Sequence, residues 1–147
     1  MTLSGRMPYG EAAVSIVATR TEAVFAQRGN VLDTADIEGV HGMRVATRRL
    51  RAALEVFGPG LQRKRGKRAL REVKALAAAL GERRDRDVQL ERLARLHGET
   101  AGAERRAVEL LADELRHEQR QANRGLAAAL RHAKRTRLHR RLRRLTR

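Results

Sequence analysis

The sequence predicts an all-α protein, a helical bundle of about five or six antiparallel helices. Alanine, leucine, arginine and glutamate dominate the composition, and these residues favour helix. Aromatic residues make up only 2% of the chain, and few segments are rich in the residues that favour strands. Apolar residues also recur at spacings of three and four, which is the period of a helix face. With 147 residues, the chain suits one domain with a buried core.

The first expected helix covers residues 8–28. Pro8 suits its first turn, because proline has a helical φ and its missing N–H is not needed there. Val17 and Val24 fall on one face of this helix. Gly29 suits its C-terminal end, so a linker is expected over residues 30–36.

The second expected helix covers residues 36–57. Asp36 suits its N-cap, because the carboxylate can accept a hydrogen bond from a first-turn N–H. The Gly58–Pro59–Gly60 sequence must break the helix, since proline lacks the N–H that the next turn requires. The break is only about five residues long, so the second and third helices are expected to be antiparallel neighbours.

A third helix is expected over residues 62–80, with Gly81 as its end. Asp85 or Asp87 then suits the N-cap of a short fourth helix. That helix carries Leu90, Leu93 and Leu96.

A long fifth helix is expected after Gly98 and Gly102 and up to residue 130. Its apolar residues are spaced by threes and fours. They are Val108, Leu111, Leu115, Ala122, Leu126 and Ala129.

The chain is strongly basic, with 33 Lys and Arg against 17 Asp and Glu and a formal net charge of +16. This charge predicts an anionic partner: nucleic acid, a phosphate polymer or an acidic membrane surface. Cysteine is absent, which excludes disulfides and thiolate metal sites. No apolar run approaches the roughly 20 residues that span a bilayer, and the N-terminal stretch has no signal-peptide core. A cytoplasmic location is therefore expected.

The last 17 residues contain nine Lys and Arg and no acid. We therefore divide the chain into a bundle over residues 1–130 and a basic helix or tail over residues 131–147. Leu138, Leu142 and Leu145 give this segment only a thin apolar stripe. The segment is a candidate for binding nucleic acid, whereas its apolar stripe is too thin to favour binding to a membrane surface.

Two rows of basic side chains follow the expected second and third helices. At about 100° per residue, the side chains of the first row fall within a sector of about 80° around the helix axis. The row is about 15 Å long. The first basic row is His41, Arg44, Arg48 and Arg51, with Arg49 at its flank. The second basic row is Lys64, Lys67, Arg68, Arg71 and Lys74.

The two rows would rim one groove if the helices are antiparallel neighbours. Like charges three or four residues apart repel, whereas a polyanion would reverse the sign of this effect. Arginine binds phosphate oxygens bidentately, which favours a phosphate polymer as the ligand. The alternative is an ordinary solvated helix face, but acids are almost missing from both rows.

The remaining residues favour a binding protein over an enzyme. No Ser-His-Asp set or glycine-rich phosphate loop is evident, and we predict no catalytic residue, metal or cofactor. Asp85 and Asp87 could hold Mg²⁺, but capping a helix and pairing with Arg84 or Arg86 is the favoured interpretation.

Residues 40–57, VHGMRVATRRLRAALEVF, and residues 69–93, ALREVKALAAALGERRDRDVQLERL, resemble the CHAD family, the conserved histidine α-helical domains. The resemblance covers residues 36–93. The matching residues are His41, Arg44, Val45, Arg48, Arg49, Leu50 and Arg51, then Leu80, Gly81, Arg84, Asp85, Asp87 and Val88.

The resemblance implies a helical bundle that binds inorganic polyphosphate on a central basic surface. Related domains resemble binding and targeting modules, found with polyphosphate granules or beside triphosphate-cleaving domains. The residues that would line the anion site are His41, Arg44, Arg48 and Arg51, with Arg71, Lys74 and Arg84 as contributors.

The chain departs from the family pattern in one respect. Family members usually contain two helical repeats, and this sequence has one, with a faint echo of a second block at residues 138–145. A homodimer is therefore a hypothesis for completing a two-lobed site. The alternative function is nonspecific nucleic-acid binding. It is disfavoured because the chain offers few aromatic side chains for base stacking.

Overall fold

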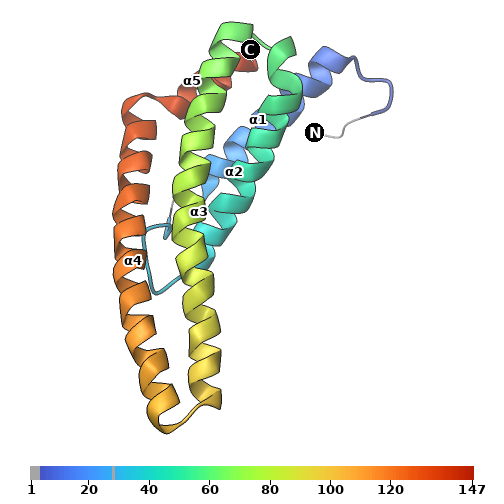
Figure 1. The fold of residues 1–147 in the computed structure, drawn as a ribbon. Helices are drawn as coiled ribbons and strands as arrows, with labels where there is room; N and C mark the ends of the chain where they lie inside the picture. Colours follow the sequence, from blue (N-terminus) through green and yellow to red (C-terminus); the bar gives the residue numbers. More distant parts are fainter. Residues whose placement is uncertain (1–3, 28) are drawn as a thin grey trace.

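The computed structural model describes residues 4–27 and 29–147, and within these ranges it contains helices and no strand. The predicted all-α helical bundle is confirmed. The elements are α1 (Tyr9–Ala26), α2 (Glu38–Phe57), the 3-10 helix η1 (Gly58–Gly60), α3 (Arg63–Glu99), α4 (Gly102–Arg135) and α5 (Leu138–Leu145) (Figure 1).

The long helices α3 and α4 form an antiparallel hairpin, and the other helices pack around its upper part (Figure 1). α2 packs between α1 and α3, and α5 contacts α1, α3 and α4. The lower part of the hairpin projects beyond the other helices (Figure 1). We call residues 88–115 the arm. Within the arm only Val108 and Ala112 are buried, so the hydrophobic core lies in the upper part.

The core is one cluster of apolar side chains to which all five α-helices contribute. Its largest fully buried members include Met43, Leu50, Leu54, Leu80 and Leu126. None of the described helices carries an uncharged apolar stretch long enough to cross a membrane.

The first two helices lie where the sequence predicts them. α1 begins directly after Pro8 and ends at Ala26, two residues before the predicted end at Arg28, which itself lies outside the described residues. α2 begins at Glu38, whose backbone N–H donates to the Asp36 carboxylate at 3.1 Å. Asp36 therefore satisfies one of the free N–H groups at the helix start, but the N-cap residue is Ile37, so the predicted N-cap is displaced by one residue.

The predicted end of the third helix at Gly81 is wrong, because α3 runs without interruption from Arg63 to Glu99. A glycine inside a helix costs only about 1 kcal/mol relative to alanine. Leu80 and Arg83, on either side of Gly81, are completely buried, and their packing outweighs this cost. Asp85 and Asp87 consequently lie within a helix and do not cap one.

The basic segment 131–147 forms the last turn of α4 and then α5. α4 continues through residue 130 to Arg135. The three leucines of the segment, Leu138, Leu142 and Leu145, are buried in the same core as the rest of the bundle. They are therefore not exposed for insertion into a membrane surface.

Candidate functional site

The first basic row lies on the side of α2 that faces away from the core. Met43, Leu50 and Leu54 are buried on the opposite side of the helix, which fixes its rotation. The row itself ranges from half-buried to exposed. His41 and Arg44 are half-buried, and Arg48, Arg49 and Arg51 are exposed.

The second basic row lies on the N-terminal half of α3, and all its side chains are exposed. Ala69, Val73 and Leu76 are buried on the other side of the helix. The row is Lys64, Lys67, Arg68, Arg71 and Lys74.

Glu55 brings the two rows together. Its carboxylate accepts a hydrogen bond from Nε of Arg51 in α2 at 3.0 Å, and Nζ of Lys74 in α3 lies 3.2 Å away. The hydrogen bond from Arg51, followed by that from Lys74, lowers the pKa of Glu55. The carboxylate is therefore an anion held between the rows, and it confirms that α2 and α3 are neighbours here.

The opposite edge of the second row meets α5 through a second carboxylate, Glu72. Glu72 receives a hydrogen bond from the Thr136 hydroxyl at 2.9 Å, pairs with Arg141, and lies 3.8 Å from Nε of Arg68. Partial burial would raise the pKa of Glu72, but the bonds from Arg141 and Thr136 outweigh it and the pKa is lowered. The basic face of α3 thus lies between α2 and α5.

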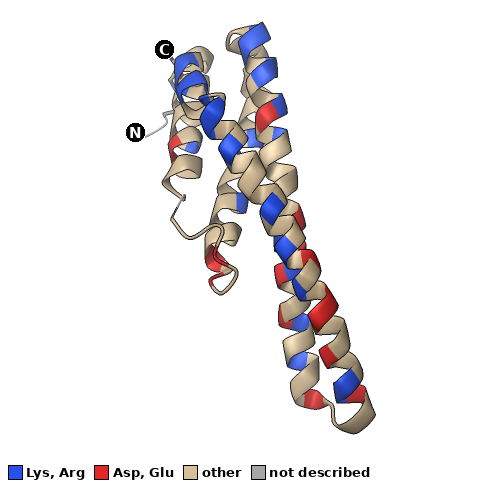
Figure 2. Ribbon diagram, turned by 90° about the vertical axis from the view of Figure 1, so that its left-hand side faces the viewer, with Lys and Arg blue, Asp and Glu red and all other residues tan. Residues whose placement is uncertain are grey.

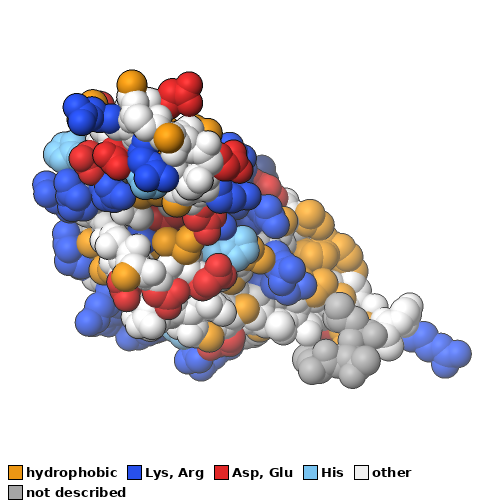
Figure 3. Space-filling model, turned by 90° about the horizontal axis from the view of Figure 1, so that it is seen from below, with side chains coloured by type: hydrophobic (Ala, Val, Ile, Leu, Met, Phe, Trp, Pro, Cys, Tyr) orange, Lys and Arg blue, Asp and Glu red, His pale blue; other side chains and the backbone are white. Residues whose placement is uncertain are grey.

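Figure 2 shows the same distribution over the whole molecule. Lys and Arg predominate on the N-terminal part of α3, on α5 and on the adjoining end of α4, whereas they alternate with Asp and Glu along the arm. Seen from the end of the arm, charges of both signs are interspersed with hydrophobic side chains (Figure 3). The positive field is therefore concentrated at the upper end of the bundle.

Two residues of the resemblance have buried nitrogens without a hydrogen-bond partner among the described residues. They are Nδ1 of His41 and one terminal nitrogen, Nη1, of Arg84. Arg84 does not belong to the second row, because it lies ten residues beyond Lys74 and is turned by about 80° around the helix.

The sequence did not predict a buried polar network between α3 and α4. Arg83 is completely buried in α3, and its Nε donates to Asp87 at 2.9 Å. The same Asp87 oxygen accepts a bond from the side-chain amide of Gln119 in α4 at 2.7 Å. The predicted pairing of Asp87 with Arg84 or Arg86 is therefore wrong. The spacing of four between Arg83 and Asp87, on the face of Leu80, was the available indication.

The same arginine holds the linker between α1 and α2. Its terminal nitrogens donate to the carbonyls of Val31 at 3.4 Å and Asp33 at 3.2 Å, and to Asn123 of α4 at 2.7 Å. The Asn123 amide in turn donates to the Leu32 carbonyl at 3.0 Å. This network fixes the linker, and with it the start of α2, against α3 and α4.

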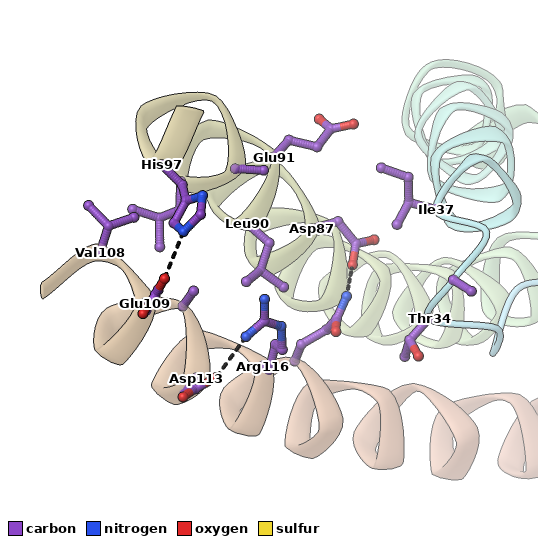
Figure 4. A pocket seen from close by; sticks show the side chains of 15 residues that line it. Thr34, Ile37, Asp87, Leu90, Glu91, His97, Val108, Glu109, Asp113 and Arg116 are labelled. Carbon is purple, nitrogen blue, oxygen red and sulfur yellow. Dashed lines mark hydrogen bonds and ion pairs between the residues drawn. The ribbon is translucent and has the colours of Figure 1, made fainter. Parts of the chain in front are cut away.

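A groove of about 820 Å³ lies along the arm, below this linker (Figure 4). Apolar side chains such as Leu90 and Val108 line it together with charges of both signs. His97 contacts Glu109 at 2.9 Å, and Arg116 pairs with Asp113 at 2.7 Å. The groove is thus different in character from the basic rows.

Comparison with known proteins gives one match. The sequence model of a family described as the CHAD domain matches residues 15–147, which is most of the chain. No curated protein and no solved structure matches.

Proposed function

Because the chain belongs to the CHAD domain family, which is associated with polyphosphate binding, we propose that it binds inorganic polyphosphate without catalysis through the two basic rows. The observation that carries the proposal is the meeting of the rows at Glu55, where Arg51 of α2 and Lys74 of α3 share one carboxylate. Side chains from two helices can therefore contact one extended ligand.

The chemistry of the rows suits a phosphate chain. Arginine donates bidentate hydrogen bonds to phosphate oxygens, and each charge-assisted bond contributes roughly 1.5–3 kcal/mol. A polyanion engages several cations at once and releases its counterions, so affinity falls steeply with salt.

The decisive experiment is a polyphosphate binding isotherm at two salt concentrations. The variant Arg44→Glu/Arg48→Glu reverses two charges of the first row and should lower affinity by at least about 100-fold. The matched control is Arg92→Glu/Arg95→Glu, which makes the same charge change at exposed positions on the arm. Equal losses in both variants would show that net charge alone drives binding and would contradict the proposal.

Two further measurements separate this function from its alternatives. Incubation with polyphosphate and Mg²⁺ should release no phosphate, and steady release would identify an enzyme. Single-stranded DNA at equal charge concentration should fail to displace polyphosphate, because few aromatic side chains are present for stacking. Efficient displacement would favour the nucleic-acid function.

We also propose that the protein forms a homodimer that completes a two-lobed site, and that polyphosphate binding targets it to granules. The single repeat in the sequence supports the dimer. The exposed leucines of the arm are the candidate contact, since Leu110 is 67% and Leu111 50% exposed. Sedimentation velocity should show a dimer that Leu110→Glu/Leu111→Glu dissociates. A monomer at every concentration would reject the dimer and leave polyphosphate binding to be judged separately.

A further inference from the structure

A second basic site lies at the corner where α4 meets α5, away from the first basic row on α2. A pocket of about 570 Å³ opens there. Its cationic lining includes Lys134, Arg137, Arg140, Arg144 and Arg147. We call this feature the corner pocket.

Most of the charge in the corner pocket is uncompensated. Arg143 donates two hydrogen bonds to the carboxylate of Glu22 in α1, both with N–O distances of 2.7 Å. His139 contacts the same carboxylate at 3.1 Å. Among the residues that the structure describes, no acidic group pairs with the five cationic lining residues named above. The pocket is therefore suited to a ligand with several negative charges.

The backbone at Arg137 supports a function for this corner. Arg137 has φ 53° and ψ 42°, and it is the one described non-glycine residue with positive φ. A turn of this shape favours glycine, because a side chain makes the left-handed conformation unfavourable. Left-handed residues end many helices, and those that carry a side chain cluster at functional sites. Here the side chain lines the corner pocket.

The pocket is also preformed. Leu138, Leu142 and Leu145 are buried in the core, so α5 presents its arginines from a fixed position. This rigidity removes the ordering cost that a mobile basic tail would bring to binding.

The second basic row connects the corner pocket to α2. On one side of α3, Glu55 joins Lys74 to Arg51 of α2. On the other side, Glu72 contacts Arg68 of α3 and Arg141 of α5. Neighbouring helix axes lie about 8–10 Å apart, so the path from α2 over α3 to α5 is about two such spacings long.

We propose that the corner pocket is a second phosphate subsite, and that one polyphosphate chain runs from α2 across α3 to α5. This inference rests on the proposed function and extends its site to residues outside the two basic rows. A short phosphate chain occupies the rows alone, and only a longer chain reaches the corner pocket.

The test compares long-chain polyphosphate with tripolyphosphate by titration of the full chain at several salt concentrations. The variant Arg140→Gln/Arg144→Gln removes two exposed cations of the pocket. It should lower affinity for the long chain about 10-fold and reduce the salt slope by about 1.4, at roughly 0.7 per phosphate contact. Tripolyphosphate affinity should stay unchanged. The control Arg92→Gln/Arg95→Gln should bind both ligands as the wild type does.

The outcomes separate this inference from the proposed function. If the wild type does not bind long-chain polyphosphate, the proposed function fails and the extension fails with it. If Arg44→Glu/Arg48→Glu loses binding while the α5 variant matches the control, only the extension fails. Equal loss of tripolyphosphate in the α5 variant would also overturn it, because the corner pocket would then not be a separate subsite.

Arg137→Gly tests the role of Arg137 in binding independently, because this substitution should not destabilise the fold. Glycine relieves the left-handed backbone, so the thermal midpoint should not fall, while affinity for the long chain should decrease. Unchanged affinity in this variant would overturn a role for Arg137 in the subsite.

Discussion

Arg83 illustrates how one side chain can determine local structure without belonging to either basic row. Its guanidinium is fully buried and donates to groups from α3, α4 and the linker before α2. A buried charge is tolerated only when it is paired and hydrogen-bonded, and here all three nitrogens have partners. Arg83 therefore acts as a positioning residue for the helix that carries the first basic row.

Replacing Arg83 by alanine should be strongly destabilising. The substitution leaves Asp87 buried without its cation, which typically costs about 3–5 kcal/mol. Chemical denaturation followed by circular dichroism measures the loss. The control is Arg86→Ala, because Arg86 pairs with Glu118 on the partly exposed surface at 3.3 Å, and such pairs contribute about 1 kcal/mol or less. Similar losses in the two variants would contradict this account of Arg83.

A second residue, Glu22, should make stability depend on acid pH. Hydrogen bonding from Arg143, reinforced by His139, lowers the pKa of Glu22 to about 2 from an ordinary value of 4.5. Because the folded-state pKa is the lower one, the stabilisation is complete above about pH 4.5 and is lost as the pH falls towards 2. Since the side chain is half exposed, we expect about 0.5–1 kcal/mol.

Thermal unfolding of Glu22→Gln between pH 6 and 2.5 measures this contribution. The difference from the wild type should be largest near pH 6 and should shrink as the pH falls. Glu11→Gln, another exposed carboxyl of α1, serves as the control and should show no such trend. A difference for Glu22→Gln that grows towards low pH would contradict the assignment.

At the scale of single elements, the sequence correctly predicted those helix ends that depend on local residues. It did not predict those that depend on packing against other helices. The Gly58–Pro59–Gly60 sequence ends α2 because proline cannot continue it, and this needs no tertiary information. Gly81 does not end α3, because buried neighbours compensate for its low helix propensity. A glycine alone does not determine whether a helix ends or continues, because the contacts that decide this come from other helices.

The glycines of α2 and α3 give a direct test of this distinction. A Cβ at position 81 would meet no atom within 4 Å, so Gly81→Ala should stabilise the protein by about 0.5–1 kcal/mol. A Cβ at position 39 would lie 2.9 Å from the Asn30 carbonyl oxygen, so Gly39→Ala should destabilise it by about 1–3 kcal/mol. Denaturant midpoints measure both changes, and opposite signs are required.

The candidate site shows the same division. The rows on α2 and α3 follow from helical periodicity, since residues on one face recur at fixed spacings. The network around Arg83 could not be predicted, because its partners at residues 31, 33 and 123 are distant in sequence. The corner pocket was missed because three leucines do not reveal whether α5 packs on the core or on a partner.

At the scale of the whole molecule, the net charge of +16 dominates. Self-repulsion of this size opposes the compact state, and dissolved salt screens it. A bound polyanion neutralises the same charge and stabilises the folded form in proportion to its occupancy. Added salt should therefore stabilise the folded state of the free protein and destabilise that of the polyanion-bound protein.

This reversal can be measured by thermal unfolding. Raising the salt concentration from about 50 to 500 mM should raise the midpoint of the free protein, since the Debye length falls well below 10 Å. With saturating polyphosphate the same change should lower the midpoint, because the ligand dissociates. A rise of similar size in both cases would contradict binding through the charged surface.

The linker between α1 and α2 has a consequence for how the protein opens. Irregular segments usually release their amide hydrogens to solvent in small local fluctuations. Here the Asp33 amide donates to the Asn30 carbonyl at 3.1 Å. The buried Arg83 guanidinium also donates hydrogen bonds to the carbonyls of Val31 and Asp33. Freeing this linker therefore requires hydrogen bonds to both α3 and α4 to break, through Arg83 and Asn123. The Asp33 amide should thus exchange more slowly than is usual for a mostly exposed loop.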